Sequence, residues 1–283
     1  MGLGQMGHRM GRRLVEHGHA LIVADAHSTS LAPSGAMIAR SNGEVSERAD
    51  IVILSLPDGQ ASLGVSRELT SGEQRRLGLV IDTSTIGIKA ARDVAEHLGG
   101  HGIGYVDAPV SGGTAGADAG SLSVIIGCSP SLFQRVSPLL SCIGDHLFHV
   151  GERPGMGQAV KLLNNFLSAT AMAATSEAIA FGTAEGLEMQ TILDVVNRST
   201  GQNTASRDKF PQRIVTETYD AGFAGAMMAK DVRLYLEEVT RAGTASQIAR
   251  QMDALWSALD QQQPDADFTR IYPFIKAPRT PST

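Results

Sequence analysis

The first 150 residues alternate short apolar runs with helical patterns, and no other feature limits the fold of this 283-residue chain as strongly. The runs are rich in β-branched residues and end at Gly, Asp, Pro or Ser, as buried strands do. The predicted strands are Ala20–Asp25, Ile51–Leu56, Leu79–Asp82, Gly104–Asp107, Leu122–Gly127 and His146–Val150. The predicted helices are Met6–His17, Gln60–Glu68, Ile88–Leu98 and Ser131–Leu140. Such alternation predicts an α/β fold with a mostly parallel sheet and helices on its faces.

The pattern changes after Gly151. A stretch without proline, from Gly157 to Leu187, is rich in Ala, Leu, Met and Ile and predicts one helix of about 25–30 residues. Further helices are predicted at Met189–Asn197, Thr204–Thr216, Gly225–Ala242 and Thr244–Gln261. No strand pattern returns, so we expect an α/β domain over residues 1–151 and an all-helical domain over residues 152–283.

Composition and charge exclude several classes of protein. The 24 basic and 29 acidic residues give a net charge of −5, which argues against a nucleic-acid partner. No apolar run reaches the ~18 residues of a membrane helix, and no basic-then-apolar leader opens the chain, so we expect no membrane partner. The two cysteines, Cys128 and Cys142, do not form a disulfide framework, and we expect a cytoplasmic protein.

A glycine motif opens the chain and leads directly into the first predicted helix. Its six residues are Gly2, Leu3, Gly4, Gln5, Met6 and Gly7. In a G-x-G-x-x-G motif the glycines permit a tight turn and the close approach of a pyrophosphate, and the helix N-terminus offers free N–H groups. Together with the strand that ends at Asp25, the motif predicts a Rossmann-type dinucleotide-binding domain.

Asp25 lies 21 residues after Gly4, where an acidic side chain is expected to meet the adenosine ribose. A carboxylate binds the ribose hydroxyls of NAD and repels the extra phosphate of NADP. The following residues contain no arginine, so NAD is favoured and NADP stays open, since His27 and Ser28 can accept a phosphate.

The motif normally follows a strand, but only Met1 precedes it here. We therefore expect the first strand of the sheet to be missing or truncated, either because the start site is placed too far downstream or because the sequence is truncated; a tolerated loss of the strand is the alternative. Such a domain exposes two strand edges.

Three loops follow predicted strands and are expected at the ligand-facing edge of the sheet. Leu56 and Pro57 lie in one and Thr85 in another; either loop is a cofactor contact or an ordinary turn. The third contains Ser111, Gly112 and Gly113, whose N–H groups and hydroxyl suit an anion such as a carboxylate; the alternative is a flexible surface loop.

Lys161 and Asn165 lie near the start of the long helix, four residues apart and so on one face. The helix dipole and the apolar neighbours of Lys161 both disfavour the ammonium, so we expect a lowered pKa and proton exchange near neutral pH. The alternative is an exposed lysine.

These motifs, in this order and over essentially the whole chain, resemble the β-hydroxyacid dehydrogenase family. The matching segments are Gly2–Gly7, Asp107–Gly113, Gly157–Asn165, Lys230-Asp231 and Phe268–Ile275. The resemblance implies an oxidoreductase in which Lys161 is the general acid/base and Asn165 binds the substrate or orients the lysine. It also implies that Ser111, Gly112 and Gly113 hold the substrate carboxylate, that Lys230 lines the cofactor–substrate cleft, and that Leu56, Pro57 and Thr85 flank the nicotinamide. No metal is required.

The resemblance leaves the substrate open. A short β-hydroxyacid such as 3-hydroxyisobutyrate, or its semialdehyde, is the first expectation; tartronate semialdehyde reduction and a non-catalytic NAD-binding scaffold are the alternatives. Asn164 stands where the related 6-phosphogluconate dehydrogenases carry histidine, and Lys161 is retained where imine-reducing relatives usually replace it. The long apolar helix predicts a homodimer or homotetramer, because one small domain cannot cover it on all sides.

Overall fold

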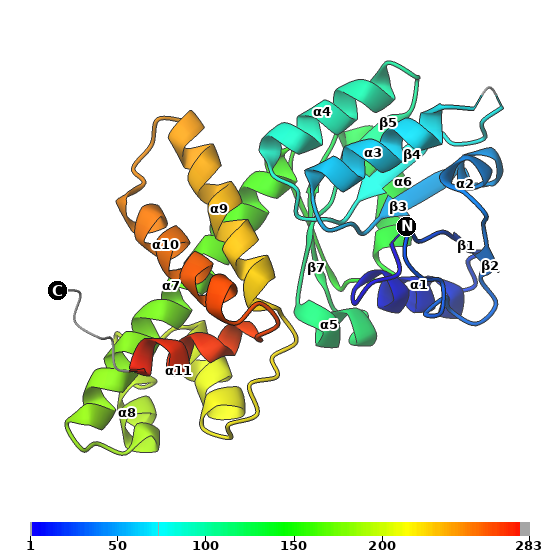
Figure 1. The fold of residues 1–283 in the computed structure, drawn as a ribbon. Helices are drawn as coiled ribbons and strands as arrows, with labels where there is room; N and C mark the ends of the chain where they lie inside the picture. Colours follow the sequence, from blue (N-terminus) through cyan, green and yellow to red (C-terminus); the bar gives the residue numbers. More distant parts are fainter. Residues whose placement is uncertain (1, 73, 278–283) are drawn as a thin grey trace. The chain divides into compact units, whose positions relative to one another are not determined.

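A computed structural model describes residues 2–72 and 74–277. The chain forms two compact units, residues 1–161 and 162–283, which are described separately (Figure 1). The division falls ten residues beyond the expected boundary at 151, inside helix α7 (Met156–Ala184). The reason is that the first turn of α7 makes its hydrogen bonds with strand β5 (Gly104–Asp107) of the first unit.

The first unit contains the mostly parallel sheet that the sequence predicts. β3 (Ile51–Leu54), β4 (Leu79–Asp82) and β5 run parallel in that order. Beyond β5 lies β7 (Ser123–Gly127), which is antiparallel to β5 and to β6 (Val110–Ser111) and parallel to β8 (His146–Gly151).

A second, separate ladder pairs β1 (Ile22–Val23) with β2 (Met37–Ile38) in parallel. Among the described strands, β1 pairs only with β2. β3 is the end strand of the larger sheet and pairs only with β4. One edge of β1 and one edge of β3 are therefore unpaired. These are the two edges expected of a sheet without its first strand; the missing strand itself stays a prediction.

Helices cover both faces of the larger sheet because alternate side chains of each strand point to opposite faces. Ile53, Ile81 and Val106 pack in one apolar cluster with helices α1, α5 and α6. Val52, Leu54 and Val80 pack in another with α2, α3 and α4, of which α3 and α4 lie side by side (Figure 1). The bounds are α1 (Gly7–Glu16), α2 (Asn42–Arg48), α3 (Gly59–Thr70), α4 (Ile88–Gly99), α5 (Gly113–Ala119) and α6 (Pro130–Leu140).

The second unit is helical, as predicted, and its core surrounds the fully buried Trp256. At 29 residues, α7 has the length that the sequence predicts. The other helices are α8 (Met189–Val196), η1 (Ala205–Ile214), α9 (Gly225–Arg241), α10 (Gln247–Gln262), η2 (Phe268–Arg270) and α11 (Ile271–Lys276). In residues 2–72 and 74–277, no helix combines the length and apolar character needed to cross a membrane.

The structure corrects the sequence-based prediction at short elements. Strands β2 and β6 and helices α2 and α5 were not predicted, because each is only two to seven residues long. Helix α5 consists of small residues and lacks an apolar period, which is why the sequence did not predict it. Segment η1, expected as an α-helix, is a π-helix that contains Pro211.

Candidate active site

The glycines of the opening motif allow two close backbone approaches. A Cβ atom added at Gly7 would lie 1.7 Å from the carbonyl oxygen of Gly2, and one added at Gly2 would lie 2.4 Å from that of Ser55. Gly4, by contrast, is exposed and has no atom within 4 Å of such a position. Helix α1 then begins at Gly7 with no acidic residue in its first turn. This open, N–H-rich turn fits the diphosphate of a dinucleotide.

Asp25 closes the turn from the other side. Its carboxylate accepts hydrogen bonds from the N–H of Leu3 (2.6 Å) and from those of His27 (2.8 Å) and Ser28 (3.0 Å). Partial burial acts to raise the pKa of Asp25, but these donors outweigh it and hold the pKa below its usual value. The side chain is therefore a carboxylate at neutral pH, and three of its roughly four acceptor positions already bind the protein's own backbone.

The loops after β3 and β4 are joined to each other. The N–H of Leu56 donates to Ser84 Oγ at 2.8 Å, so the two segments expected to flank the nicotinamide are held side by side. Pro57 is exposed and Thr85 is half-buried at this edge. Asp58, which follows Pro57, accepts from the N–H of Ala61 and caps α3, which is a structural role.

Gly112 and Gly113 join β6 to α5 in a conformation that disfavours other residues. Their φ angles are +133° and +63°. Ser111 is half-buried at the end of β6, and Gly112 is exposed. The polar turn predicted to hold a carboxylate is thus a sharp strand-to-helix corner.

Lys161 and Asn165 lie one turn apart on α7. Both are buried, with 7% and 6% of their surface exposed, so the alternative of an exposed lysine is wrong. Lys161 is the last residue of the first unit, and Asn165 belongs to the second.

In the second unit Asp231 connects two of the predicted residues. Asn165 Nδ2 donates to Asp231 Oδ2 at 2.6 Å, and Lys230 Nζ lies 3.3 Å from Asp231 Oδ1. Asp231 is 1% exposed, and a buried carboxylate requires partners of this kind. From the sequence, Asp231 was noted only as part of a motif, although an acid in the apolar pattern of α9 was a signal.

The predicted residues therefore fall into two groups. The first unit contains the glycine turn, Asp25, the loops after β3 and β4, the Ser111–Gly113 corner and Lys161; the second contains Asn165 and Lys230. Within the described ranges, no group of three or more His, Cys, Asp or Glu side chains is arranged to hold a metal ion.

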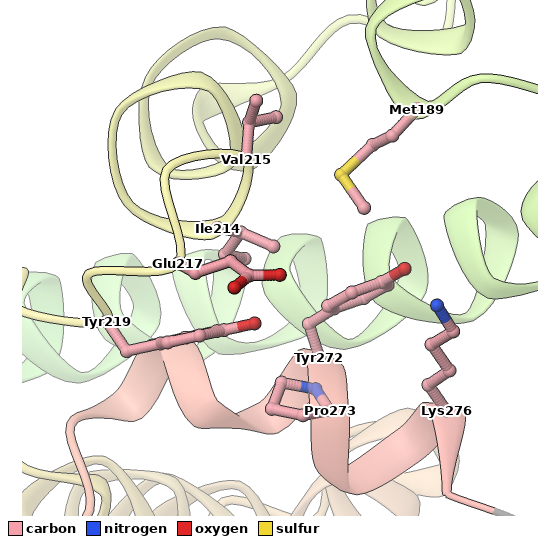
Figure 2. A pocket seen from close by; sticks show the side chains of 8 residues that line it. All are labelled: Met189, Ile214, Val215, Glu217, Tyr219, Tyr272, Pro273 and Lys276. Atoms are coloured by element: carbon pink, nitrogen blue, oxygen red, sulfur yellow. The ribbon is translucent and has the colours of Figure 1, made fainter.

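A cavity of about 290 Å³ lies elsewhere in the second unit (Figure 2). It is lined by Met189, Ile214, Val215, Glu217, Tyr219, Tyr272, Pro273 and Lys276. None of these residues is among the predicted site residues.

Two segments of the chain match families of NAD-binding domains, and together they cover most of its length. Residues 1–151 match the family described as the NAD-binding domain of 6-phosphogluconate dehydrogenase. Residues 155–275 match the family described as NAD-binding of NADP-dependent 3-hydroxyisobutyrate dehydrogenase. This chain belongs to the β-hydroxyacid dehydrogenase family. It is accordingly an NAD(P)-dependent oxidoreductase that acts on CH–OH groups.

Individual members of the family are similar over most of their length. The 3-hydroxyisobutyrate dehydrogenase of Pseudomonas aeruginosa is 35% identical, with 96% of this chain and 95% of that protein aligned. The 2-(hydroxymethyl)glutarate dehydrogenase of Eubacterium barkeri is 33% identical over 84% of this chain and 80% of its own. A structure of Mycobacterium tuberculosis 3-hydroxyisobutyrate dehydrogenase with L-serine superposes with a TM-score of 0.91 at 30% identity, covering 98% and 97% of the two chains.

Proposed function

We propose that this enzyme oxidises short carboxylates that carry a hydroxymethyl group on the carbon beside the carboxylate, with 3-hydroxyisobutyrate as the first candidate. The compounds in the names of the relatives share this skeleton: 3-hydroxyisobutyrate, 2-(hydroxymethyl)glutarate and L-serine differ only in the third substituent. Reduction of tartronate semialdehyde produces the same skeleton with a hydroxyl substituent, so this alternative is the reverse reaction on one more member of the class.

The observation that carries the proposed proton transfer is the burial of Lys161 near the N-terminus of α7. In this proposal the Lys161 amine, in its neutral form, takes the proton of the substrate hydroxyl as the C–H bond breaks and the carbonyl forms. The nicotinamide, when bound, supplies the acceptor for the hydride. In reduction the ammonium returns the proton to the oxygen.

The other residues orient the substrate in this proposal. The Ser111 hydroxyl and the N–H groups of Gly112 and Gly113 hold the carboxylate, because such a corner presents several donors to one anion. The Asn165 amide is itself fixed by Asp231 and orients the hydroxyl end. Lys230 provides a positive charge that attracts an anionic substrate, and its ion pair with Asp231 partly neutralises that charge.

A substitution at Lys161 tests the mechanism. We expect Lys161→Ala to lower kcat with 3-hydroxyisobutyrate by about 10²–10⁴-fold, because proton transfer is lost. The Kd for NADH, followed by its fluorescence, should change little. Lys161→Arg is the matched control, since it keeps the charge but does not release a proton, and it should be as inactive as the alanine variant. Unchanged turnover in either variant would refute the role of Lys161.

For the cofactor we propose NAD over NADP. Asp25 is an ionised carboxylate beside the glycine turn, and it repels a 2′-phosphate. The kcat/KM for NAD should exceed that for NADP by tenfold or more. A tenfold ratio corresponds to a difference in activation free energy on the order of 1.4 kcal/mol. A ratio near or below one would contradict this assignment.

We also propose that the protein is a cytoplasmic homodimer or homotetramer. Phe181 near the end of α7, Leu187 between α7 and α8, and Val195 on α8 are 70%, 55% and 62% exposed, and a second copy of the chain would cover them. Multi-angle light scattering at micromolar concentration should give a multiple of the 29.8 kDa chain mass. A particle of about 30 kDa would contradict the proposal.

A further inference from the structure

The carboxylate of Asp107 caps a helix that begins 49 residues later. Asp107 ends strand β5 and is completely buried. Its Oδ2 atom accepts hydrogen bonds from the N–H of Gly155 (3.0 Å) and of Gln158 (3.1 Å), at the start of α7. The first N–H groups of a helix have no partner within the helix, so Asp107 satisfies two of them and places a carboxylate at the positive end of the dipole.

Gln158 extends this contact to the loop after β4. Its Nε2 donates to Asp107 Oδ1 at 2.7 Å and to the carbonyl oxygen of Ser84 at 3.0 Å. Its Oε1 accepts from the N–H of Ile86 (2.9 Å) and of Gly87 (3.2 Å). The side chain is fully buried, and both donors and both acceptor positions of the amide are used. A glutamate at this position would lack both donors.

Two glycines allow the first turn of α7 to lie this close to the sheet. A Cβ at Gly157 would be 2.5 Å from the carbonyl oxygen of Ile125 and 3.0 Å from Asp107 Oδ2. Gly155 has a φ of +90°, and a Cβ there would be 2.8 Å from Ile88 Cγ2. The turn therefore has little room to shift against β5 and β7.

We propose that Asp107 and Gln158 are positioning residues that hold Lys161 at a fixed place relative to the loop containing Thr85. This inference rests on the proposed role of Lys161. Lys161 follows Gln158 by three residues, about 4.5 Å along the helix axis and on the same side of the helix. The loop from Ser84 to Gly87 is attached to Gln158, so one amide sets the distance between the lysine and the loop expected to flank the nicotinamide. A displacement of about 1 Å at a reacting group can cost on the order of 100-fold in rate.

A double-mutant cycle measured above pH 7, where Asp107 is ionised, tests the pair. In Asp107→Asn, the new Nδ2 faces the Nε2 of Gln158, donor against donor. In Gln158→Glu, oxygens face both Asp107 Oδ1 and the Ser84 carbonyl. Combining the two substitutions lets the new amide at position 107 donate to the new carboxylate at position 158 and leaves only the conflict at Ser84. We therefore expect each single variant to lower kcat by about 10–100-fold, and the double variant to lose roughly tenfold less than the product of the two.

The readouts separate positioning from simple loss of stability. The kcat per folded molecule should fall while the substrate KM and the Kd for NADH change less than about threefold. Ser41→Ala is the control: Ser41 caps α2 of the same unit, so its loss should lower the melting temperature but not kcat. Gly157→Ala keeps both polar side chains but places a Cβ against the Ile125 carbonyl oxygen and Asp107, so it should also lower kcat by shifting the turn.

Two results would overturn the proposal. One is an unchanged kcat per folded molecule in Gln158→Glu or Gly157→Ala; the other is a double variant whose losses simply multiply. Lys161→Ala distinguishes this proposal from the proposed function on which it rests. If that variant is inactive while the cycle shows no coupling, the positioning role fails alone; if it is fully active, the proposed function fails.

Discussion

The two units hold the residues of the candidate site in different ways. In the first unit, buried or partly buried side chains bind backbone groups: Asp25 binds three N–H groups, Asp107 binds two and Gln158 binds two more and a carbonyl. Among the candidate site residues of the second unit the polar contacts are between side chains, with Asp231 joining Asn165 and Lys230.

This difference indicates what each unit tolerates. A backbone arrangement depends on glycines and on groups of one particular shape, so a single added methyl group can displace it. A side-chain contact between helices can be weakened without moving the helices, because the backbone bonds of a helix are internal. Substitutions at the candidate site residues of the first unit should therefore have larger effects than those at the candidate site residues of the second.

The largest effect is expected at the glycine turn. Gly7→Ala places a Cβ 1.7 Å from the Gly2 carbonyl oxygen, so the turn must open. We expect the Kd for NADH to rise by about 100-fold or more, which corresponds to a loss of binding free energy of roughly 2.8 kcal/mol. Gly64→Ala is the matched control, since a Cβ on that residue of α3 meets no atom within 4 Å and should leave binding unchanged. Titration by NADH fluorescence measures both; equal affinities would show that the turn does not bind the cofactor.

A smaller effect is expected from Asp231 in the second unit. Asp231→Asn still accepts a hydrogen bond from Asn165 but loses the charge opposite Lys230. We expect kcat/KM for the hydroxyacid to fall about tenfold, with the Kd for NADH unchanged, as for a buried charge-assisted contact worth roughly 1.5 kcal/mol. The control is Asp253→Asn, which removes the longer 3.8 Å pair with Arg233 on the same helix as Asp231. If Asp231→Asn lowered kcat/KM by about 100-fold or more, the factor expected for the Kd for NADH in Gly7→Ala, the two units would not differ in the way described.

The last expected effect concerns stability and not binding or turnover: the free energy of unfolding should change with pH. Burial raises the pKa of Asp107 to about 7, against hydrogen bonds from Gln158 that act to lower it. Asp82 lies opposite on β4 and its pKa is raised by burial; Tyr105 and Cys128 also lie nearby and stay neutral in this range. Residues 155–160 of the opposing turn carry no charge.

Asp107 stays protonated to a higher pH in the folded state than in the unfolded state. The folded state therefore binds more protons than the unfolded state between about pH 4 and 7. The free energy of unfolding should therefore decrease as the pH rises through this window, by up to about 1.4 kcal/mol per pH unit. Asp107→Asn removes this titration, so the unfolding free energy of the wild type minus that of the variant should fall as the pH rises from about 5 to 7. Urea denaturation at several pH values measures this; a constant or rising value would contradict the raised pKa.

Much of this arrangement was predictable because the signals were local. The glycine turn, the strand ends and the long helix follow from residue types at fixed spacing, and the burial of Lys161 follows from its apolar neighbours. Strands of two residues and the small-residue helix α5 carry too little apolar periodicity to be recognised.

The contacts that sequence reasoning missed are those between distant segments. Asp107 and Gln158 are 51 residues apart, and Asn165 and Asp231 are 66 apart. A sequence shows that each is polar within an apolar stretch, but the partner is decided by the three-dimensional packing. Gln158 lies within the segment Gly157–Asn165, but nothing in the sequence indicated its role. Its side chain makes three hydrogen bonds to the backbone of the loop after β4.

A matched substrate panel tests the proposed hydroxymethyl specificity most directly. NADH formation would be followed at saturating NAD with 3-hydroxyisobutyrate, L-serine and glycerate, and with lactate, which has the carboxylate but no hydroxymethyl group. We expect turnover of at least one hydroxymethyl compound with a kcat/KM 100-fold or more above that for lactate, about 2.7 kcal/mol. Lactate oxidised as well as the best of the three, or no turnover of any of them by enzyme that binds NADH, would contradict it.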